Sequence, residues 1–388
     1  SIFGQAVIML LIQIGGLGLM TLMAVFILLL KSRLSMHEKI AMKEMLNQEQ
    51  VFNMHRFLMD ILKYTLLFEG SGMLLLALRF VPEYGFLSGG FKAMFIAVSA
   101  FCNAGFDILG SVSLMDYAHD PLVMFTIMAL IVLGGLGFAV WFDLRDKVKL
   151  LLKKELKLDR FRKSLSIHTR IVLAMTLLLI FMTAGIIFFL EWDNPGTLGP
   201  FAWWEKGMSS LFESVTLRTA GFASVDYGSL TLASKFLMII IMFIGGSPGS
   251  TAGGAKTTTM VVLLFYAVAM IRNREDINLF GRRLSSDVVR KANAVVVINF
   301  SLAFGAACAI MALQPTIPMP DVVFEVLSAI NTVGMTTGIT RELGVISKLI
   351  VAVLMYCGRL GSLSFALVLA KKPSTNHVRE PQEKIIVG

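Results

Sequence analysis

The sequence predicts an all-α integral membrane protein in which units of helix, pore loop and helix repeat along the chain. Composition gives the first support, because hydrophobic residues make up 56% of the 388 residues and charged residues only 16%. Soluble domains carry roughly 25% charged residues. Two further observations, long apolar runs and glycine motifs that recur in phase, predict the number and order of the units.

Seven apolar runs are long enough to cross a bilayer, which takes about 20 apolar residues in a helix. Three shorter amphiphilic stretches, 89–107, 205–223 and 320–338, are too short to cross. We expect them to enter the membrane and return to the same side. A non-helical backbone is tolerated at membrane depth only where protein shields it from lipid. The seven runs cover residues 4–30, 56–80, 120–142, 168–190, 232–271, 291–313 and 346–370.

Lysine and arginine gather between the apolar runs, at 31–43, 145–170, 272–291 and 371–372. Loops rich in these residues stay on the cytoplasmic side of a membrane. Because the basic residues lie between apolar runs, we read the formal net charge of +9 as basic cytoplasmic loops of a cell-membrane protein. No nucleic-acid partner is expected. The re-entrant stretches then open to the outside, where an acidic surround would concentrate cations.

A glycine motif recurs within four of the apolar runs. Residues 15–18 and 134–137 both read Gly-Gly-Leu-Gly, 245–249 read Gly-Gly-Ser-Pro-Gly, and 358–361 read Gly-Arg-Leu-Gly. The motifs begin at residues 15, 134, 245 and 358, so their spacings are 119, 111 and 113. Such a regular period indicates an internal repeat.

A second motif recurs in the same phase, at the end of each amphiphilic stretch. Its glycines, Gly105, Gly221 and Gly334, are 116 and 113 residues apart and precede their partner motifs by 29, 24 and 24 residues. Two marks in one phase predict a unit of outer helix, pore loop and inner helix. The first motif, at Gly15, would then need a filter glycine before Ser1, so we expect an outer helix and a pore loop upstream of this sequence.

The phase divides the chain into one incomplete and three complete units. We expect the inner helix of repeat 1 at 1–31, repeat 2 at 55–142, repeat 3 with a broken inner helix at 168–271, repeat 4 at 290–370, and a cytoplasmic tail at 371–388.

The recurring pore-loop glycines suit a selectivity filter for a dehydrated cation such as potassium. Backbone carbonyls can replace the hydration shell of such an ion, and glycine permits the backbone conformation that turns them inward. One such glycine would be an ordinary turn residue, but three in phase favour a filter. The candidate filter residues are Asn103, Ala104, Gly105, Phe106, Thr219, Ala220, Gly221, Phe222, Thr332, Val333, Gly334 and Met335.

The run 232–271 is interrupted by glycines, a proline and hydroxyl side chains. These residues weaken a helix, and an irregular backbone at membrane depth must line a watery cavity. We expect a mobile gate, although a static kink would explain the same residues. The candidate gate residues are Gly245, Gly246, Ser247, Pro248, Gly249, Ser250, Thr251, Gly253, Gly254, Lys256 and Arg359.

Arg359 lies within the last apolar run, where a charge is costly and usually functional. Below a filter it would act as an electrostatic barrier to cations, or as a latch on carbonyls of the gate. The alternative is a structural ion pair, for which Glu69 in another apolar run is the candidate partner.

Together these residues resemble the Trk/Ktr/HKT potassium-uptake superfamily, most closely its bacterial Ktr membrane subunits. The resemblance rests on the repeated filter glycines, the Gly-Gly-Leu-Gly motifs, the break at 245–256 and Arg359. It implies four pore loops around one pseudo-fourfold pore, potassium as the transported ion and sodium as a modulator. It also implies a homodimer in the lipid bilayer, controlled by a cytoplasmic nucleotide-binding ring.

An alternating-access cation transporter with broken helices would also explain the break at 245–256. A membrane enzyme is not expected, because the five histidines are scattered and no nucleophile–base pair or metal-ligand cluster is apparent. The basic segments 143–167 and 272–291 would dock either a soluble regulator or anionic lipid.

Overall fold

The computed structural model describes residues 1–18, 54–110, 112–274, 277–280 and 282–361. Within these residues the fold is almost entirely helical, with one antiparallel pair of two-residue strands, β1 (Asn278–Leu279) and β2 (Arg282–Arg283). The helices are α1 (Ile2–Leu17), α4 (Met54–Tyr84), α5 (Phe86–Phe101), α6 (Pro121–Leu136), α7 (Phe138–Leu152), α8 (Leu158–Ser164), α9 (Ile167–Leu190), α10 (Trp203–Thr216), α11 (Leu232–Met242), α12 (Thr257–Ile271), α13 (Ser286–Leu313), α14 (Met319–Ile330) and α15 (Val345–Leu360).

Three of the described helices, α4, α9 and α13, are long and apolar enough to cross a membrane, and α6 with α7 would form a fourth span if the bent pair is counted as one. Many of their large apolar side chains face outward, such as Leu74 at 69% exposed and Phe181 at 65%. In water this exposure would be unfavourable, but it suits contact with lipid. The all-helical membrane class predicted from the sequence is therefore confirmed.

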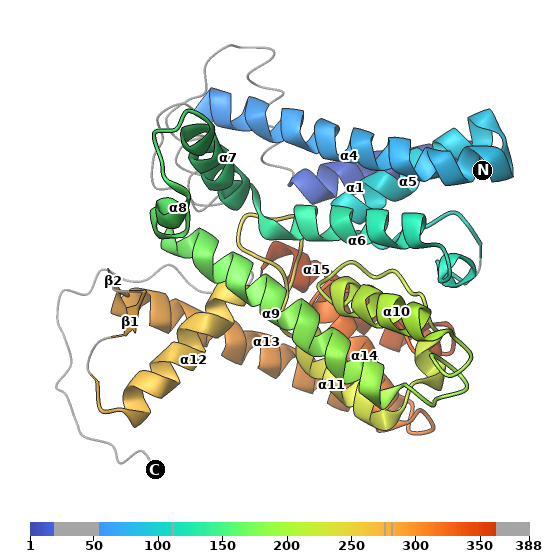
Figure 1. Ribbon diagram of the computed structural model, residues 1–388. Coiled ribbons are helices and arrows are strands. Elements are labelled where there is room, and N and C mark those ends of the chain that lie inside the picture. The colour runs from blue at the N-terminus through green and yellow to red at the C-terminus, as the bar shows by residue number, and fades with distance from the viewer. Residues whose placement is uncertain (19–53, 111, 275–276, 281, 362–388) are drawn as a thin grey trace, which may run out of the picture.

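The apolar run 120–142 does not form one straight helix, contrary to the expectation of a simple span. α6 ends at Leu136, and α7 leaves it at an angle of 96°, as Figure 1 shows. The bend lies at Gly137, whose φ of 90° is in the region that favours glycine. α1 and α15 end in the same way, at Gly18 (φ 85°) and Gly361 (φ 87°). The last glycine of the recurring motif thus ends α1, α6 and α15.

Three short helices of 16, 14 and 12 residues, α5, α10 and α14, pack among the other helices (Figure 1). α5 contacts α4 and α6, α10 contacts α9 and α6, and α14 contacts α11, α13 and α15. Each carries a strongly buried face, and Phe95, Phe212 and Phe324 are at most 1% exposed. The short helices therefore form the centre of the fold and fix the loops that follow them.

The long apolar run 232–271 folds as two helices, α11 and α12, with an irregular segment at 243–256 between them. An isolated parallel bridge joins Ile244 to Ala255, and the Gly245 amide donates to the Ala255 carbonyl at 2.7 Å. The segment therefore leaves the helix axis and returns to it as a closed loop. Below, the gate loop means residues 245–256. The predicted tail, 371–388, and residues 19–31 of the first predicted unit lie outside the described residues.

Candidate functional site

The loops that follow α5, α10 and α14 have the same backbone conformation. In each, a non-glycine residue and the glycine two positions later both have positive φ, a combination that is rare for ordinary residues. The amide between them donates to a carbonyl near the end of its helix, at Ser99, Thr216 and Ser328. The pairs are Asn103 and Gly105 (φ 51° and 71°), Thr219 and Gly221 (68° and 83°), and Thr332 and Gly334 (54° and 90°).

The three glycines, which lie far apart in sequence, meet in space. A Cβ atom on Gly105 would overlap the carbonyl oxygen of Ala220 and lie 2.9 Å from Cα of Gly221. A Cβ atom on Gly221 would overlap the carbonyl oxygen of Val333. A Cβ atom on Gly334 would lie 3.6 Å from Cα of Gly221. The approaches at Gly105 and Gly221 leave room for hydrogen only, so these two positions require glycine both by φ and by contact, whereas Gly334 favours glycine by its φ.

The loop after α10 is held from behind by buried polar side chains. The Thr216 hydroxyl lies 2.9 Å from the Phe222 amide, from which it accepts, and 2.8 Å from the Phe222 carbonyl, to which it donates. Glu213 accepts from the amide and hydroxyl of Ser224, at 2.9 and 2.7 Å, and from the Tyr227 hydroxyl. Bonds to a buried carboxylate are strong and directional. They fix the chain on the far side of Gly221.

A cavity of about 430 Å³ adjoins the converging loops. Its walls include Gly105 and Gly334 at one part and Arg359 at another, so the guanidinium and the filter loops share one space. Phe106 faces it with 53% of its surface exposed, whereas Phe222, its counterpart after α10, is buried. Hydroxyls of Ser328, Thr332, Thr336 and Thr340 give part of this cavity a polar lining.

The gate loop is bound on one side to the end of α6. The amides of Ser247 and Thr251 donate to the carbonyls of Gly135 and Gly134, at 3.2 and 3.3 Å. The Thr251 hydroxyl donates to the carbonyl of Phe101, the last residue of α5, at 3.0 Å. These bonds tie the loop directly to the base of a pore helix.

On its other side the gate loop lies against the filter loop after α14. A Cβ on Gly253 would overlap the Thr332 hydroxyl, and one on Gly254 would lie 3.1 Å from the side-chain oxygen of Asn331. Lys256 stays within the loop, with its Nζ donating to the Ala252 carbonyl at 2.7 Å. The candidate gate residues and filter residues are thus brought into one region.

Arg359 joins α15 to the gate loop rather than to an acid. Its Nη1 donates to the Thr251 carbonyl at 2.8 Å, and its Nη2 donates to the carbonyl of Gly15 on α1. Glu69 instead accepts from the Gln13 side chain at 3.2 Å and lies 3.8 Å from the Cys102 sulfur. The ion pair considered between Arg359 and Glu69 is therefore wrong for this structure, because each group already has other partners.

Two buried charged residues beside the candidate filter loops were not predicted from the sequence. Arg218, one residue before Thr219, is 3% exposed, and its Nε and Nη2 have no partner among the described residues. Glu325 on α14 is 6% exposed. A signal for Glu325 was present, because Glu213 and Glu325 are 112 residues apart, close to the repeat period.

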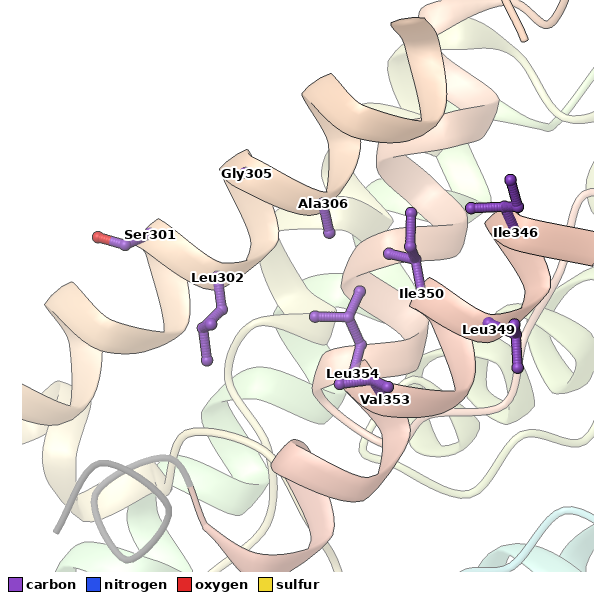
Figure 2. Close-up of a pocket in the computed structure, with 9 residues that line it drawn as sticks. All are labelled: Ser301, Leu302, Gly305, Ala306, Ile346, Leu349, Ile350, Val353 and Leu354. Carbon is purple, nitrogen blue, oxygen red and sulfur yellow. The ribbon is translucent and has the colours of Figure 1, made fainter. Parts of the chain in front are cut away.

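A separate groove of about 440 Å³ lies between α13 and α15. Figure 2 shows Leu302 and Ala306 of α13 facing Ile350 and Leu354 of α15 across it. Nearly all of its lining is aliphatic, so it does not suit a cation, which needs oxygen ligands.

The apolar spans and the converging loops define a multi-pass membrane protein with a candidate cation pathway at its centre. Residues 1–380 match the model of the TrkH family, described as a cation transport protein. The chain belongs to this family, which confirms the resemblance read from the sequence.

Curated relatives and a solved structure agree with this assignment. The chain is 37% identical over 388 residues to Ktr system potassium uptake protein B of Bacillus subtilis, with all of this chain and 84% of the relative covered. It is 37% identical over 392 residues to the potassium/sodium uptake protein NtpJ of Enterococcus hirae, covering 99% and 83%. The crystal structure of the potassium transporter TrkH from Vibrio parahaemolyticus aligns with a TM-score of 0.68 at 17% identity, over 93% of this chain and 71% of that one, and shows the shared fold.

Proposed function

We propose that this chain takes up potassium through a channel-like pore whose filter is formed by backbone carbonyls at Gly105, Gly221 and Gly334. The observation that carries the proposal is the convergence of these glycines, with Gly105 and Gly221 each against a carbonyl oxygen of the next loop and Gly334 facing Gly221. The named activities of the Bacillus subtilis and Enterococcus hirae relatives support potassium as the ion and sodium as a modulator.

In the proposed filter, backbone carbonyl oxygens replace the water molecules of the ion's hydration shell. A bare alkali cation needs several oxygens at once, and carbonyls of adjacent loops provide them without a full negative charge. The C-terminal ends of α5, α10 and α14 precede the loops and carry partial negative charge, which favours a cation at their meeting point. We place the three loops in a pseudo-fourfold ring, with complete units at 55–142, 168–271 and 290–370.

The gate loop and Arg359 form the proposed gate. The loop contacts the base of α5, the end of α6 and the loop after α14. Arg359 holds it through the Thr251 carbonyl and shares a cavity with Gly105 and Gly334. A fixed positive charge beside the pathway repels cations, so this arrangement corresponds to a closed state.

We further propose a homodimer with basic loops on the cytoplasmic side, where a nucleotide-binding regulatory ring acts on the gate. α12 begins where the gate loop ends and leads to the basic segment 272–291. A regulator that moves α12 would therefore move the gate loop.

Ion flux into lipid vesicles tests the proposal. Purified chain reconstituted in vesicles should admit potassium and rubidium in preference to sodium, and Gly221→Ser should reduce that preference. A Gly221→Ser variant that folds and keeps unchanged selectivity would contradict a filter at this glycine.

The second candidate, alternating access, is favoured by the break between α11 and α12. Single-channel current recording separates the two mechanisms, because only an open pore passes enough ions to give discrete current steps. Slow uptake that saturates and shows no such steps would support alternating access.

A further inference from the structure

Two buried glutamates occupy equivalent places in the pore helices α10 and α14. The filter amide of Ala220 donates to the Thr216 carbonyl, and that of Val333 donates to the Ser328 carbonyl. Glu213 and Glu325 each lie three residues before that acceptor. Counting forward from Gly221 and Gly334 pairs Ser224 with Thr337 and Tyr227 with Thr340.

The two glutamates differ in how their carboxylates are paired. Glu213 has both oxygens bonded, one to the amide and hydroxyl of Ser224 and the other to Tyr227. Glu325 has only one oxygen bonded, Oε1, which accepts from the Thr340 hydroxyl. Its Oε2 and the hydroxyl of Thr337 are both buried, and neither has a partner among the described residues. Both carboxylate oxygens of Glu213 are therefore hydrogen-bonded, whereas one carboxylate oxygen of Glu325 is not.

An open buried carboxylate needs compensation. Leaving a charged group without partners costs more than leaving a neutral one, and Glu325 forms no ion pair within the part of the chain that the structure describes. Glu325 also lines the cavity beside the filter, together with Thr336 and Thr340, whose hydroxyl oxygens are 2.8 Å apart. A proton on the carboxyl group or a cation bound to its oxygen atoms would compensate the charge.

We propose that Glu325 binds a sodium ion, with the hydroxyl oxygens of Thr337 and Thr336 as further ligands. A single carboxylate balances one positive charge, so a divalent ion would leave a net buried charge. Carboxylate and hydroxyl oxygens suit a hard cation such as sodium. The site rests on the proposed function and gives its sodium modulator a location.

The consequence is a cation-dependent hold on one filter loop. Thr336 and Thr337 follow Gly334 by two and three residues, so an ion that joins them to Glu325 fixes the chain behind that glycine. In the loop after α10, Ser224 and Tyr227 do this without an ion. Sodium would thus order one loop of the filter while potassium passes through it.

Sodium binding to the purified full chain tests this site directly. Radioactive ²²Na⁺ is titrated in choline buffer, with potassium and lithium as competitors. Wild type should bind one sodium ion per chain. Potassium should displace the bound ²²Na⁺ less effectively than unlabelled sodium does. Glu325→Gln and Thr337→Val should each weaken binding by about tenfold or more, because a charged ligand or a hydroxyl ligand is lost. Both variants must elute as monodisperse protein, and Thr337→Val decides the result if Glu325→Gln does not fold.

Two matched variants separate this site from the filter and from general stability. Glu213→Gln changes the equivalent glutamate, whose carboxylate is already paired, and should keep sodium binding even if its melting temperature falls. Gly105→Ser changes a filter glycine whose added Cβ would meet the backbone of Ala220 and Gly221 in the loop after α10. It should change potassium flux and keep sodium binding, so that failure of the filter proposal is distinguishable from failure of this one. Unchanged sodium affinity in both Glu325→Gln and Thr337→Val, or loss of binding in Gly105→Ser alone, would overturn the site.

Discussion

The guanidinium of Arg359 donates to the Thr251 carbonyl at 2.8 Å, across 108 residues of sequence. This bond links α15 to the gate loop between α11 and α12. Because the Thr251 hydroxyl also donates to the carbonyl of Phe101, the last residue of α5, Thr251 connects α15, the gate loop and α5. The first two predictions follow from this connection.

Replacing Arg359 with glutamine should increase potassium flux. The change removes a positive charge beside the pathway and a charge-assisted hydrogen bond worth about 1.5–3 kcal/mol to the gate loop. That energy corresponds to about a tenfold or larger shift toward the open state. Rubidium uptake into vesicles measures it. If the purified variant is folded and its flux is at or below the wild-type level, Arg359 is not a barrier or latch.

Deleting residues 247–255 should give flux that no longer responds to a regulator. The deletion removes the amides of Ser247 and Thr251, which bind the end of α6, and the Thr251 carbonyl that binds Arg359. Gly245 and Lys256 remain to join α11 to α12. Uptake is compared with and without the cytoplasmic fraction of cells that express the intact system. Flux that stays fully regulated would indicate a static kink instead of a gate.

Thr216→Val should loosen the filter loop after α10. Valine has nearly the same shape as threonine but cannot bond the Phe222 amide and carbonyl, now at 2.9 and 2.8 Å from the hydroxyl. Leaving these buried groups unpaired costs about 1–3 kcal/mol. We expect a lower melting temperature and a smaller ratio of potassium to sodium flux. Thr176→Val is the matched control, because its buried hydroxyl has no partner among the described residues. Equal selectivity in both variants would contradict the role given to Thr216.

Glu191 should make stability depend on acid pH. It follows α9, and burial raises its pKa, but hydrogen bonds from Ser234, Thr197, Thr231 and Asn194 outweigh burial, so the net pKa lies below its ordinary value of 4.5. A carboxylate whose pKa is lower in the folded state stabilises the fold above the unfolded pKa, and the effect is lost as pH falls through the folded pKa.

The measurement is the melting temperature of wild type minus that of Glu191→Gln across pH. The difference should be constant above about pH 5.5 and shrink as pH falls below the ordinary value of 4.5. A difference that grows toward acid pH would mean that Glu191 is held neutral in the fold.

The candidate filter loops could be predicted from the sequence because their left-handed backbone favours glycine, and recurring glycines are visible in a sequence. Gly105, Gly221 and Gly334 recur in phase, and the structure brings them into contact. The sequence could not give the 96° bend at Gly137, because apolar residues continue past it and only the backbone dihedral angles reveal the turn.

The partners of buried charged residues could not be predicted from the sequence either. Arg359 has two backbone carbonyls as acceptors, and a backbone acceptor has no sequence signature. The pairing of Arg359 with Glu69 was therefore wrong, although both were identified as charges within apolar runs. Glu325 was missed because its importance lies in a difference from Glu213, and that difference appears only when the two loops are compared atom by atom.

The most direct test of the account locates the ion itself. Thallium(I) scatters X-rays anomalously and replaces potassium in carbonyl sites, so crystals of the full chain grown with thallium should show anomalous density between Gly105, Gly221 and Gly334. The account predicts a peak bounded by the backbone of these loops, within coordination distance of carbonyls such as those of Ala220 and Val333. Ordered thallium elsewhere, with none at the converging glycines, would contradict a carbonyl filter.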